Sequence, residues 1–384
     1  MRKPKEWNPP CPNPACSPYR LMHRGNISAL STSLTQSGTR RSFRCSACAQ
    51  PFAATRDTVF LDLRPPEEKS IMALKMLLVQ VALSDSGFVL GVTAGTVLEW
   101  RRRAAQQAEE STAHLRRELP VTQVQRDERW NCIRRKQAQQ AGPDGESTEV
   151  REDGRQWVWM SFAPELRLIL AACVGPRTFD RAWQLIPRTA AVVWGVPCFC
   201  SDGLSGYLSA LLAVYHTLKT FPRTGQPGRP QQPVPEPHPE LVYGQVIQKK
   251  HKGRLQDLVY RIRCGSQRLA ALGLSISPSV LERLNRTLRH ALAPWVRKSG
   301  NFWKDRIQMR RRVVLFQAFS NFARPHMSWR VPLPDQEPHA AGLFQPKWCH
   351  RTPGMAAGLT DHVWTFRELL TAKFEPIHNQ SGSG

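Results

Sequence analysis

Three acidic residues stand where a fold of strands and helices could gather them into one site. Asp127 lies in a predicted strand, Asp202 directly follows a later predicted strand, and Glu282 lies on a predicted amphipathic helix. Enzymes of phosphoryl transfer hold two divalent cations about 4 Å apart with carboxylates. Each acid alone is weak evidence, because a single strand or turn carboxylate commonly only meets solvent. Together, on these elements and in this order, they predict a carboxylate site for Mg²⁺.

Glu128 directly follows Asp127 and competes with it for a place in this site. Successive side chains of a strand point to opposite faces of a sheet, so we expect only one of the two to serve the site. We choose Asp127. Glu128 is then expected to support the site from outside its ligand set or to face solvent.

The helix of Glu282 also carries Asn285, Arg286 and Arg289, which lie three, four and seven residues further along and therefore share its face. For an arbitrary helix this pattern indicates a solvated face with a Glu–Arg pair. Beside a metal site, the same side chains would bind DNA phosphates, to which arginine is suited by its bidentate geometry.

Two close cysteine pairs near the N-terminus have the spacing of zinc ligands: Cys11 with Cys16, and Cys45 with Cys48. Each pair can present two thiolates from a tight turn to one tetrahedral ion, which predicts a four-cysteine zinc ribbon. The alternative is four unrelated buried cysteines.

A basic hairpin is predicted between the two cysteine pairs. It carries Arg40, Arg41 and Arg44, with Phe43 at its tip, and it is suited to contact phosphates.

Segment 64–110 is predicted to be helical. A short helix, a turn at 91–93 and a second helix predict a helix-turn-helix, whose second helix would lie in a major groove with Arg101, Arg102 and Arg103 on phosphates. An ordinary helical hairpin is the alternative. A basic run further along the chain, with Lys249 and Lys250, is expected to follow the DNA backbone.

The fold class predicted from the order of elements is α/β. Between residues 120 and 220 the order is strand, strand, strand, helix, strand, helix, which suits a mixed sheet with helices packed on it, the ribonuclease-H-like plan. We divide the chain into a zinc ribbon at 1–60, a helix-turn-helix region with a linker helix at 61–119, a catalytic domain at 120–330 with a Pro-rich insertion at 222–240, and a tail with a terminal helix at 331–380. Residues 381–384, Ser-Gly-Ser-Gly, look like an engineered linker.

The composition indicates a polyanionic partner. The chain has 384 residues, a formal net charge of +24 and ten cysteines, and its sequence pI is about 10.4. Such a field suits nucleic acid better than a small-molecule substrate. We find no apolar run long enough to cross a membrane and no secretory signal, so we expect a cytoplasmic protein with reduced cysteines, associated with the nucleoid when bound to DNA.

These motifs together resemble those of bacterial insertion-sequence transposases of the DDE class, of the IS-one type with its two reading frames joined. The resemblance covers nearly the whole chain. It rests on the cysteine pairs, on the segments around Asp127, Asp202 and Glu282, and on 319–326.

The resemblance implies a DNA transposase that binds the terminal inverted repeats of an insertion sequence and catalyses strand cleavage and strand transfer. It implies two Mg²⁺ or Mn²⁺ ions per active site, held by Asp127, Asp202 and Glu282, and a structural Zn²⁺. The implied partners are double-stranded DNA, at the element ends and the target, and further copies of the chain in a homodimer or higher oligomer. Two other functions stay open: a catalytically silent DNA-binding regulator on the same scaffold, and a structure-specific nuclease.

Overall fold

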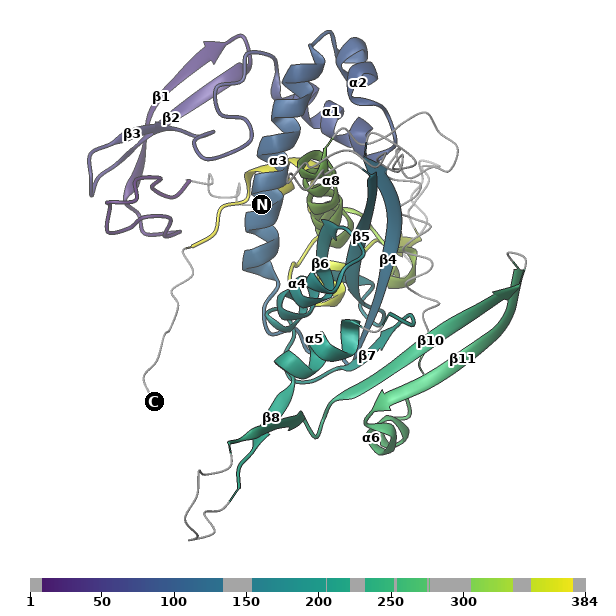
Figure 1. Ribbon diagram of the computed structural model, residues 1–384. Coiled ribbons are helices and arrows are strands. Elements are labelled where there is room, and N and C mark those ends of the chain that lie inside the picture. The colour runs from purple at the N-terminus through teal and green to yellow at the C-terminus, as the bar shows by residue number, and fades with distance from the viewer. Residues whose placement is uncertain are drawn as a thin grey trace, which may run out of the picture.

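The computed structural model describes residues 9–133, 154–204, 206–221, 232–251, 254–274, 276, 305–333 and 347–375. Glu282, Asn285, Arg286 and Arg289 lie outside these residues. Within them, a small N-terminal sheet stands to one side of a larger central sheet, and helices cover the central sheet (Figure 1).

The N-terminal sheet consists of β1 (Ile27–Thr35), β2 (Gly38–Cys45) and β3 (Pro51–Ala53), all antiparallel. Its small core is made of Phe43, Phe52 and three buried cysteines. Phe43 therefore does not form an exposed aromatic tip as predicted. It is drawn inward because its strand alternates and the cysteine cluster offers the apolar surface on that side.

The central sheet is mixed and has six strands in the order β11–β10–β7–β4–β5–β6. Its strands are β4 (Gln123–Ile133), β5 (Gly154–Ala163), β6 (Leu168–Gly175), β7 (Cys198–Ser201), β10 (Val242–His251) and β11 (Arg254–Cys264). β5 runs antiparallel to β4 and to β6, whereas β7 runs parallel to β4 and to β10. The first strand of this sheet thus lies beside the fourth, as the predicted ribonuclease-H-like plan requires.

The middle of the sheet is covered on both faces. On one face, α4 (Phe179–Ala190) and α5 (Gly206–Val214) form a core with Trp159, Phe199 and Tyr243. On the other face, Val158 and Met160 join a second core. Because neighbours along β5 point into different cores, the middle of this strand, Trp157–Met160, is apolar at every position instead of alternating with polar residues.

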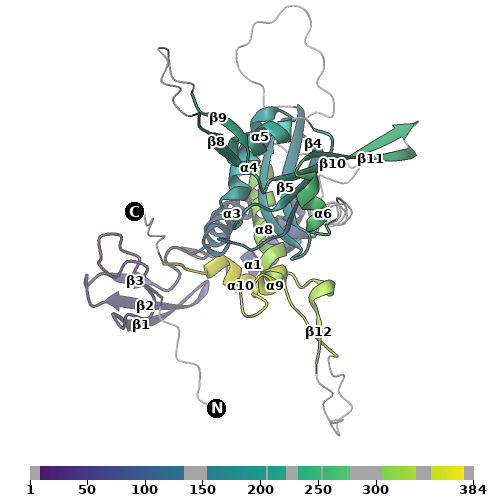
Figure 2. The same ribbon diagram turned by 90° about the horizontal axis from the view of Figure 1, so that it is seen from below.

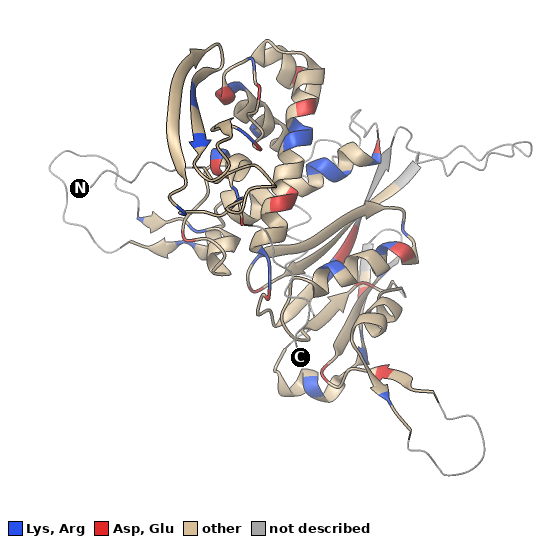
Figure 3. Cartoon of the chain, turned by 90° about the vertical axis from the view of Figure 1, so that its left-hand side faces the viewer, with Lys and Arg blue, Asp and Glu red and all other residues tan. Residues whose placement is uncertain are grey.

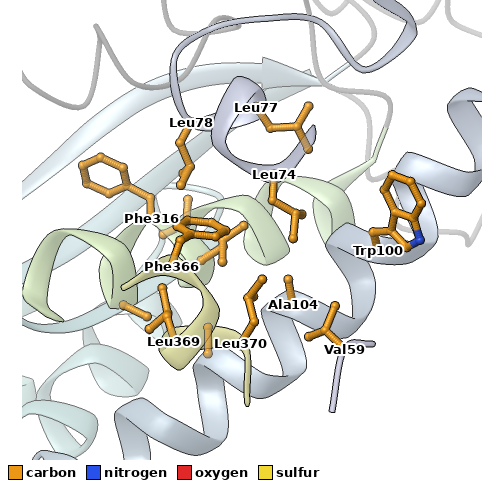
Figure 4. Packing of buried hydrophobic residues seen from close by; sticks show 14 of the residues in the cluster. Val59, Leu74, Leu77, Leu78, Trp100, Ala104, Phe316, Phe366, Leu369 and Leu370 are labelled. Atoms are coloured by element: carbon orange, nitrogen blue, oxygen red, sulfur yellow. The ribbon is translucent and has the colours of Figure 1, made fainter. Parts of the chain in front are cut away.

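The second core is built from helices far apart in the sequence: α1 (Glu67–Leu78), α3 (Ala94–Leu115), α8 (Arg306–Ala318) and α10 (Phe366–Thr371). Figure 4 shows Phe316 of α8 and Phe366 of α10 close to Leu74 of α1. Trp100 and Ala104 of α3 are buried in the same cluster. The predicted boundary at residue 119 is therefore not a break in the hydrophobic core, because the helices before it pack on the sheet after it.

A helix, a turn and a second helix do follow one another where the helix-turn-helix was predicted. α2 (Leu83–Leu90) ends at Gly91, which has a left-handed backbone with φ of 64°. The Thr93 side chain then accepts a hydrogen bond from the Thr96 N–H and caps α3. Gly87 lies where an added Cβ would come 2.7 Å from the Val92 carbonyl oxygen, so glycine permits the close approach of the two helices.

Two hairpins project from the sheet (Figures 1 and 2). One is formed by β10 and β11, and the other by β8 (His216–Lys219) with β9 (Val234–Pro237). We predicted a Pro-rich insertion at 222–240, and within it β9 forms a short strand. Proline is compatible with β9, because a two-stranded hairpin leaves outward-facing N–H positions without ladder bonds.

The remaining elements are short. They are α6 (Ser266–Ala271), the π-helical turn η2 (Phe319–Ala323), the 3₁₀ turn η3 (Met327–Trp329), β12 (Val331–Pro332), β13 (Trp348–Cys349) and α9 (Pro353–Ala356). No helix among the described residues is long and apolar enough to cross a membrane.

Candidate carboxylate and cysteine metal centres

Asp127 and Asp202 meet because their strands are parallel neighbours. The register pairs Gln123 with Cys198 and Gln125 with Cys200. β7 ends at Ser201. Asp202 is the next residue, and it lies level with Asp127 on β4. One carboxylate oxygen from each of Asp127, Glu128 and Asp202 lies within 4.8 Å of the others.

The inclusion of Glu128 corrects our prediction that only one of the two adjacent acids can reach this site. The backbone does alternate, since Asp127 pairs with Met160 and Glu128 with Trp159, which belong to different cores. However, β4 pairs with β7 only as far as Gln125. Beyond Gln125, among the described residues, no strand pairs with β4 on the side of β7. Side chains from both faces of β4 can therefore bend around this edge toward Asp202.

Backbone hydrogen bonds orient the two aspartates. Asp202 Oδ1 accepts a bond of 3.1 Å from the Leu204 N–H, and Asp127 Oδ1 accepts one of 2.8 Å from the Glu128 N–H. The Ser201 hydroxyl, just before Asp202, is 2.7 Å from the buried Tyr243 hydroxyl. These contacts hold the end of β7 and leave Asp202 Oδ2 directed toward another partner.

That partner is Arg177, which the sequence analysis missed. Its Nη2 donates to Asp202 Oδ2 at 2.9 Å and to Glu128 Oε2 at 3.1 Å, and its guanidinium stacks 5.0 Å from the Trp157 ring centre. Arg177 follows β6, which runs parallel to β4 and β7, so the loop after β6 and the end of β7 share one edge of the sheet. A basic residue in a loop after such a strand was the available signal.

Glu128 occupies the most buried part of the cluster, with a side chain only 1% exposed, against 36% for Asp202. Burial, together with the neighbouring charge of Asp202, raises the pKa of Glu128 to about 8. The Tyr207 hydroxyl faces the carboxylate without reaching hydrogen-bond geometry.

A second buried arginine lies behind the acids. Arg126 stacks on the rings of Phe199, Tyr207 and Tyr243 at 4.8, 4.6 and 5.4 Å. Its side chain lies on the face of β4 that also carries Glu128, and burial lowers its pKa. This cation sits in an aromatic cage within the core, so it adds positive charge near the acids without occupying the site.

The donor set of the carboxylate cluster fits a hard divalent cation. Mg²⁺ is bound through one or two carboxylates and keeps several waters, which a partly exposed cluster of oxygens allows. The structure thus brings two of the three predicted acids, Asp127 and Asp202, together with Glu128. The third predicted acid, Glu282, lies outside the described residues.

The four predicted cysteines also meet. Their sulfur atoms all lie within 4.8 Å of one another, with Cys11 and Cys48, and likewise Cys16 and Cys45, separated by 3.7 Å. Four thiolates bound at about 2.3 Å to a tetrahedral zinc would lie roughly 3.8 Å apart. The cluster therefore fits zinc, and the three nearly inaccessible cysteines fit a closed structural site.

The surroundings of Cys45 favour a thiolate. Burial raises its pKa, but backbone N–H groups at Cys48 and Ala47 and the Asn26 side chain outweigh this and lower the pKa to about 6. Asn26 Nδ2 lies 3.1 Å from the sulfur. Hydrogen bonds from outside the ligand set are typical of zinc–thiolate sites, where they stabilise the sulfur charge.

The arginines predicted to bind DNA on the N-terminal hairpin are exposed. Arg40, Arg41 and Arg44 all lie on β2. Arg40 is 3.7 Å from Asp62, and Arg40 and Arg41 line a cavity of about 580 Å³ between the small sheet and α1. These side chains are accessible to a phosphate backbone.

The arginines predicted on α3 are placed differently. Arg101 is 4% exposed and donates to Gln308 of α8, so it is not available at the surface as predicted. It is buried because α3 packs against α8 on the side that carries Trp100 and Ala104. Arg102 and Arg103 both form ion pairs with Glu99.

The basic run on the projecting hairpin is only partly described. Lys249 is exposed on β10, opposite Asp257 of β11, and Lys250 follows it on the same strand. Figure 3 shows Lys and Arg positions spread over the small sheet, the helices and the central sheet, with Asp and Glu positions among them. The positive charge of the chain is therefore not confined to one element.

No family model matches the chain, and no curated protein matches it. Among solved structures, similarity is found to a Mos1 transposase paired-end complex with the left transposon end, at 14% identity and a TM-score of 0.15, over 40% of this chain and 58% of that one. A Mos1 strand transfer complex gives 14% identity and a TM-score of 0.16, over 40% and 56%. A mariner Mos1 paired-end complex with Mg gives 16% identity and a TM-score of 0.14, over 39% and 58%.

The chain thus spans little more than half of the length of these structures. TM-scores of this size do not establish a common fold, so the fold of this chain rests on the strand order and strand directions of its own sheet.

Proposed function

We propose that this chain is a DNA transposase of the DDE class, of the insertion-sequence IS-one type. In this proposal it binds the terminal inverted repeats of an element and then cleaves and joins phosphodiester bonds. Asp127 and Asp202 are the two acids contributed by the central sheet, and Glu282 is the third acid proposed from the sequence.

The observation that carries the proposal is the meeting of Asp127 and Asp202 between two parallel neighbouring strands. These residues are far apart in the sequence, and only the pairing of β4 with β7 brings them together. A carboxylate cluster at the end of a strand, partly open to solvent, suits a site that must admit both cations and a DNA strand.

In the proposed reaction the protein mainly positions groups. The Leu204 N–H holds Asp202 through Oδ1, and Asp202 Oδ2 is the oxygen that faces Arg177. Two Mg²⁺ or Mn²⁺ ions, when bound, would supply activation of the attacking hydroxyl and stabilisation of the leaving oxygen. Asn285, Arg286 and Arg289 are proposed to hold phosphates next to the reacting bond.

The N-terminal sheet is proposed to be a zinc ribbon that contacts DNA. Cys11, Cys16, Cys45 and Cys48 would hold the structural ion, and the exposed arginines of β2 would contact the backbone. Joining two element ends in one reaction requires two catalytic chains on the DNA, so we propose a dimer or a higher oligomer.

The test is a strand-cleavage and strand-joining assay of the full chain with Mg²⁺ and DNA carrying the inverted repeats that flank its gene. We expect the parent protein to nick at the repeat ends and to join them to target DNA. Asp202→Asn should abolish both steps, whereas Asp180→Asn, an exposed acid on α4, should leave them unchanged. An Asp202→Asn protein as active as the parent would overturn the site.

The same assay separates the other functions. Cleavage without joining would favour a nuclease, and specific binding of the repeats without cleavage would favour a regulator. The cluster of three carboxylates favours chemistry over a purely regulatory role, because binding alone has no use for closely spaced negative charges beside DNA.

A further inference from the structure

We propose that Glu128 is a ligand of the divalent-cation site together with Asp127 and Asp202, and that Arg177 is a resident counter-cation which the incoming metal ion displaces. The inference rests on the proposed function, whose site it extends. It replaces the expectation that Glu128 stands outside the ligand set.

The burial of Glu128 argues for a ligand. Its side chain is 1% exposed, and one of its oxygens, Oε2, is bonded to Arg177. The other, Oε1, is buried and makes no hydrogen bond to the described residues. A buried carboxylate oxygen without a partner is costly, and a cation bound by the neighbouring aspartates would supply that partner.

The geometry allows Glu128 to reach the same ion as the aspartates. Its carboxylate, with those of Asp127 and Asp202, forms a group in which the nearest oxygens are all within 4.8 Å. Glu128 approaches from one face of β4 and Asp127 from the other, while Asp202 lies beyond the end of β7. Three carboxylates from three directions can surround an ion, whereas acids on one face of a sheet could only contact it from one side.

Arg177 has the position of a cation held by this cluster. A single nitrogen, Nη2, bonds both Glu128 and Asp202 at 2.9–3.1 Å. Two aspartates and a glutamate share the single guanidinium of Arg177, so a divalent ion, with twice its charge, would interact more strongly with the same oxygens. A divalent ion bound to these oxygens would compete directly with the guanidinium.

Arg177 is also able to leave. Its side chain is 38% exposed, and its guanidinium stacks on the face of Trp157 instead of being enclosed by it. The arginine can therefore turn toward solvent at small cost, and near DNA it would meet phosphate oxygens, which its planar fork binds well. Metal entry and phosphate contact by Arg177 would then accompany one another.

The test is Mn²⁺ binding to the full chain without DNA, measured by titration calorimetry and by the electron paramagnetic resonance signal of free Mn²⁺. We expect Glu128→Gln to weaken Mn²⁺ binding by about 10- to 100-fold or more. Arg177→Gln should strengthen it by about 10-fold, because a competing cation is removed. Asp180→Asn and Arg188→Gln, exposed positions on α4, should bind Mn²⁺ like the parent protein.

Two results would overturn the inference while leaving the proposed function standing. Glu128→Gln could bind Mn²⁺ as tightly as the parent while Asp202→Asn loses binding; Glu128 is then not a ligand. Arg177→Gln could bind Mn²⁺ no better than the parent; Arg177 is then not a competitor. Should Glu128→Gln fail to fold, Glu128→Asp keeps the charge but shortens the reach, and unchanged Mn²⁺ affinity in that folded variant would again count against a ligand. A parent protein that binds no Mn²⁺ would contradict the proposed function itself.

Discussion

The cysteine cluster and the carboxylate cluster are built in opposite ways. The four cysteines lie within one short stretch of chain, with Cys11 and Cys48 separated by 37 positions, and a small local sheet holds them. The carboxylates come from β4 and from the end of β7, which are joined only through the pairing of the central sheet. One site is a local structure, and the other depends on the whole fold.

The two clusters also differ in how they meet solvent. Three of the cysteines are almost inaccessible, whereas Asp202 is more than a third exposed and an arginine bridges two of the acids. A closed set of thiolates suits an ion that stays in place and stabilises a fold. A partly open set of oxygens, held by a displaceable arginine, suits ions that take part in a reaction.

The largest effect should come from breaking the cysteine site. Cys45→Ser is expected to remove the single zinc ion per chain, whose apparent binding free energy in small domains is about 10–16 kcal/mol. Because the small sheet has its own core, β1–β3 should unfold while the central sheet persists. Elemental analysis and hydrogen exchange measure both effects. Cys349→Ser, at an exposed cysteine, should keep the zinc, and a fully protected β2 in a zinc-free protein would contradict the prediction.

The next effect is catalytic. Asp127→Asn should lower the rate of DNA cleavage by about 10³-fold, the equivalent of roughly 4 kcal/mol in the activation free energy. Combining it with Asp202→Asn should cost little more, because ligands of one site act as a unit. Single-turnover cleavage rates give the comparison. If the rate loss of the double variant equalled the product of the losses of the two single variants, the two aspartates would act independently and not in one site.

A smaller effect concerns stability and pH in buffer without divalent cations. The pKa of Glu128 is raised to about 8 in the folded chain, against about 4.3 for an unfolded glutamate. The folded protein thus holds an extra proton between these values, so its stability is highest at the acid end and falls as the pH rises toward 8. The loss should be on the order of 3 kcal/mol.

Urea unfolding at pH 5 and pH 8 measures this loss. Glu128→Gln should remove most of the pH dependence, because the amide cannot ionise. If the free energy of unfolding changed with pH as much in the variant as in the parent, the pH dependence would belong to other groups. If the cysteine cluster keeps a zinc ion, it should make no comparable contribution, since bound thiolates stay ionised through this range.

The smallest effect separates exposed from buried arginines in DNA binding. Arg44→Gln on β2 should lower the slope of log affinity against log salt concentration by about 1, because one phosphate contact is lost. Arg101→Gln should leave that slope unchanged, since Arg101 is buried against α8. Fluorescence anisotropy at several salt concentrations measures both slopes. A reduced slope for Arg101→Gln would show that α3 opens to bind DNA.

Much of the architecture was predictable because it follows from hydrophobic periodicity and element order. The strand, strand, strand, helix, strand, helix order led to a mixed sheet in which β4 lies beside β7. What misled the prediction was local: alternation along β4 was taken to separate Glu128 from Asp127, but pairing with β7 stops before either residue. Where the pairing between two strands ends depends on both strands in space. The pattern of residues along one strand carries no information about this.

Arg177 and Arg101 both show that the sequence does not indicate which arginines are exposed or near the acids. Arg177 was overlooked because it lies in a loop without a motif, and the sheet alone brings that loop to Asp202. Arg101 was assigned to DNA because it lies in a basic run, whereas packing of α3 against α8 buries it. Charge in a sequence indicates the class of partner, but exposure is decided by packing.

The sequence alone determined the ligand types: four thiols at close spacing, and acids on strands that a mixed sheet would place side by side. Thiols so close along the chain need only local turns to meet, so their cluster was predictable in full. The carboxylate site required tertiary structure, because its membership depends on where β7 ends and on which side chains can turn around the open edge of β4. Only the fold brought Glu128 and Arg177 into that site.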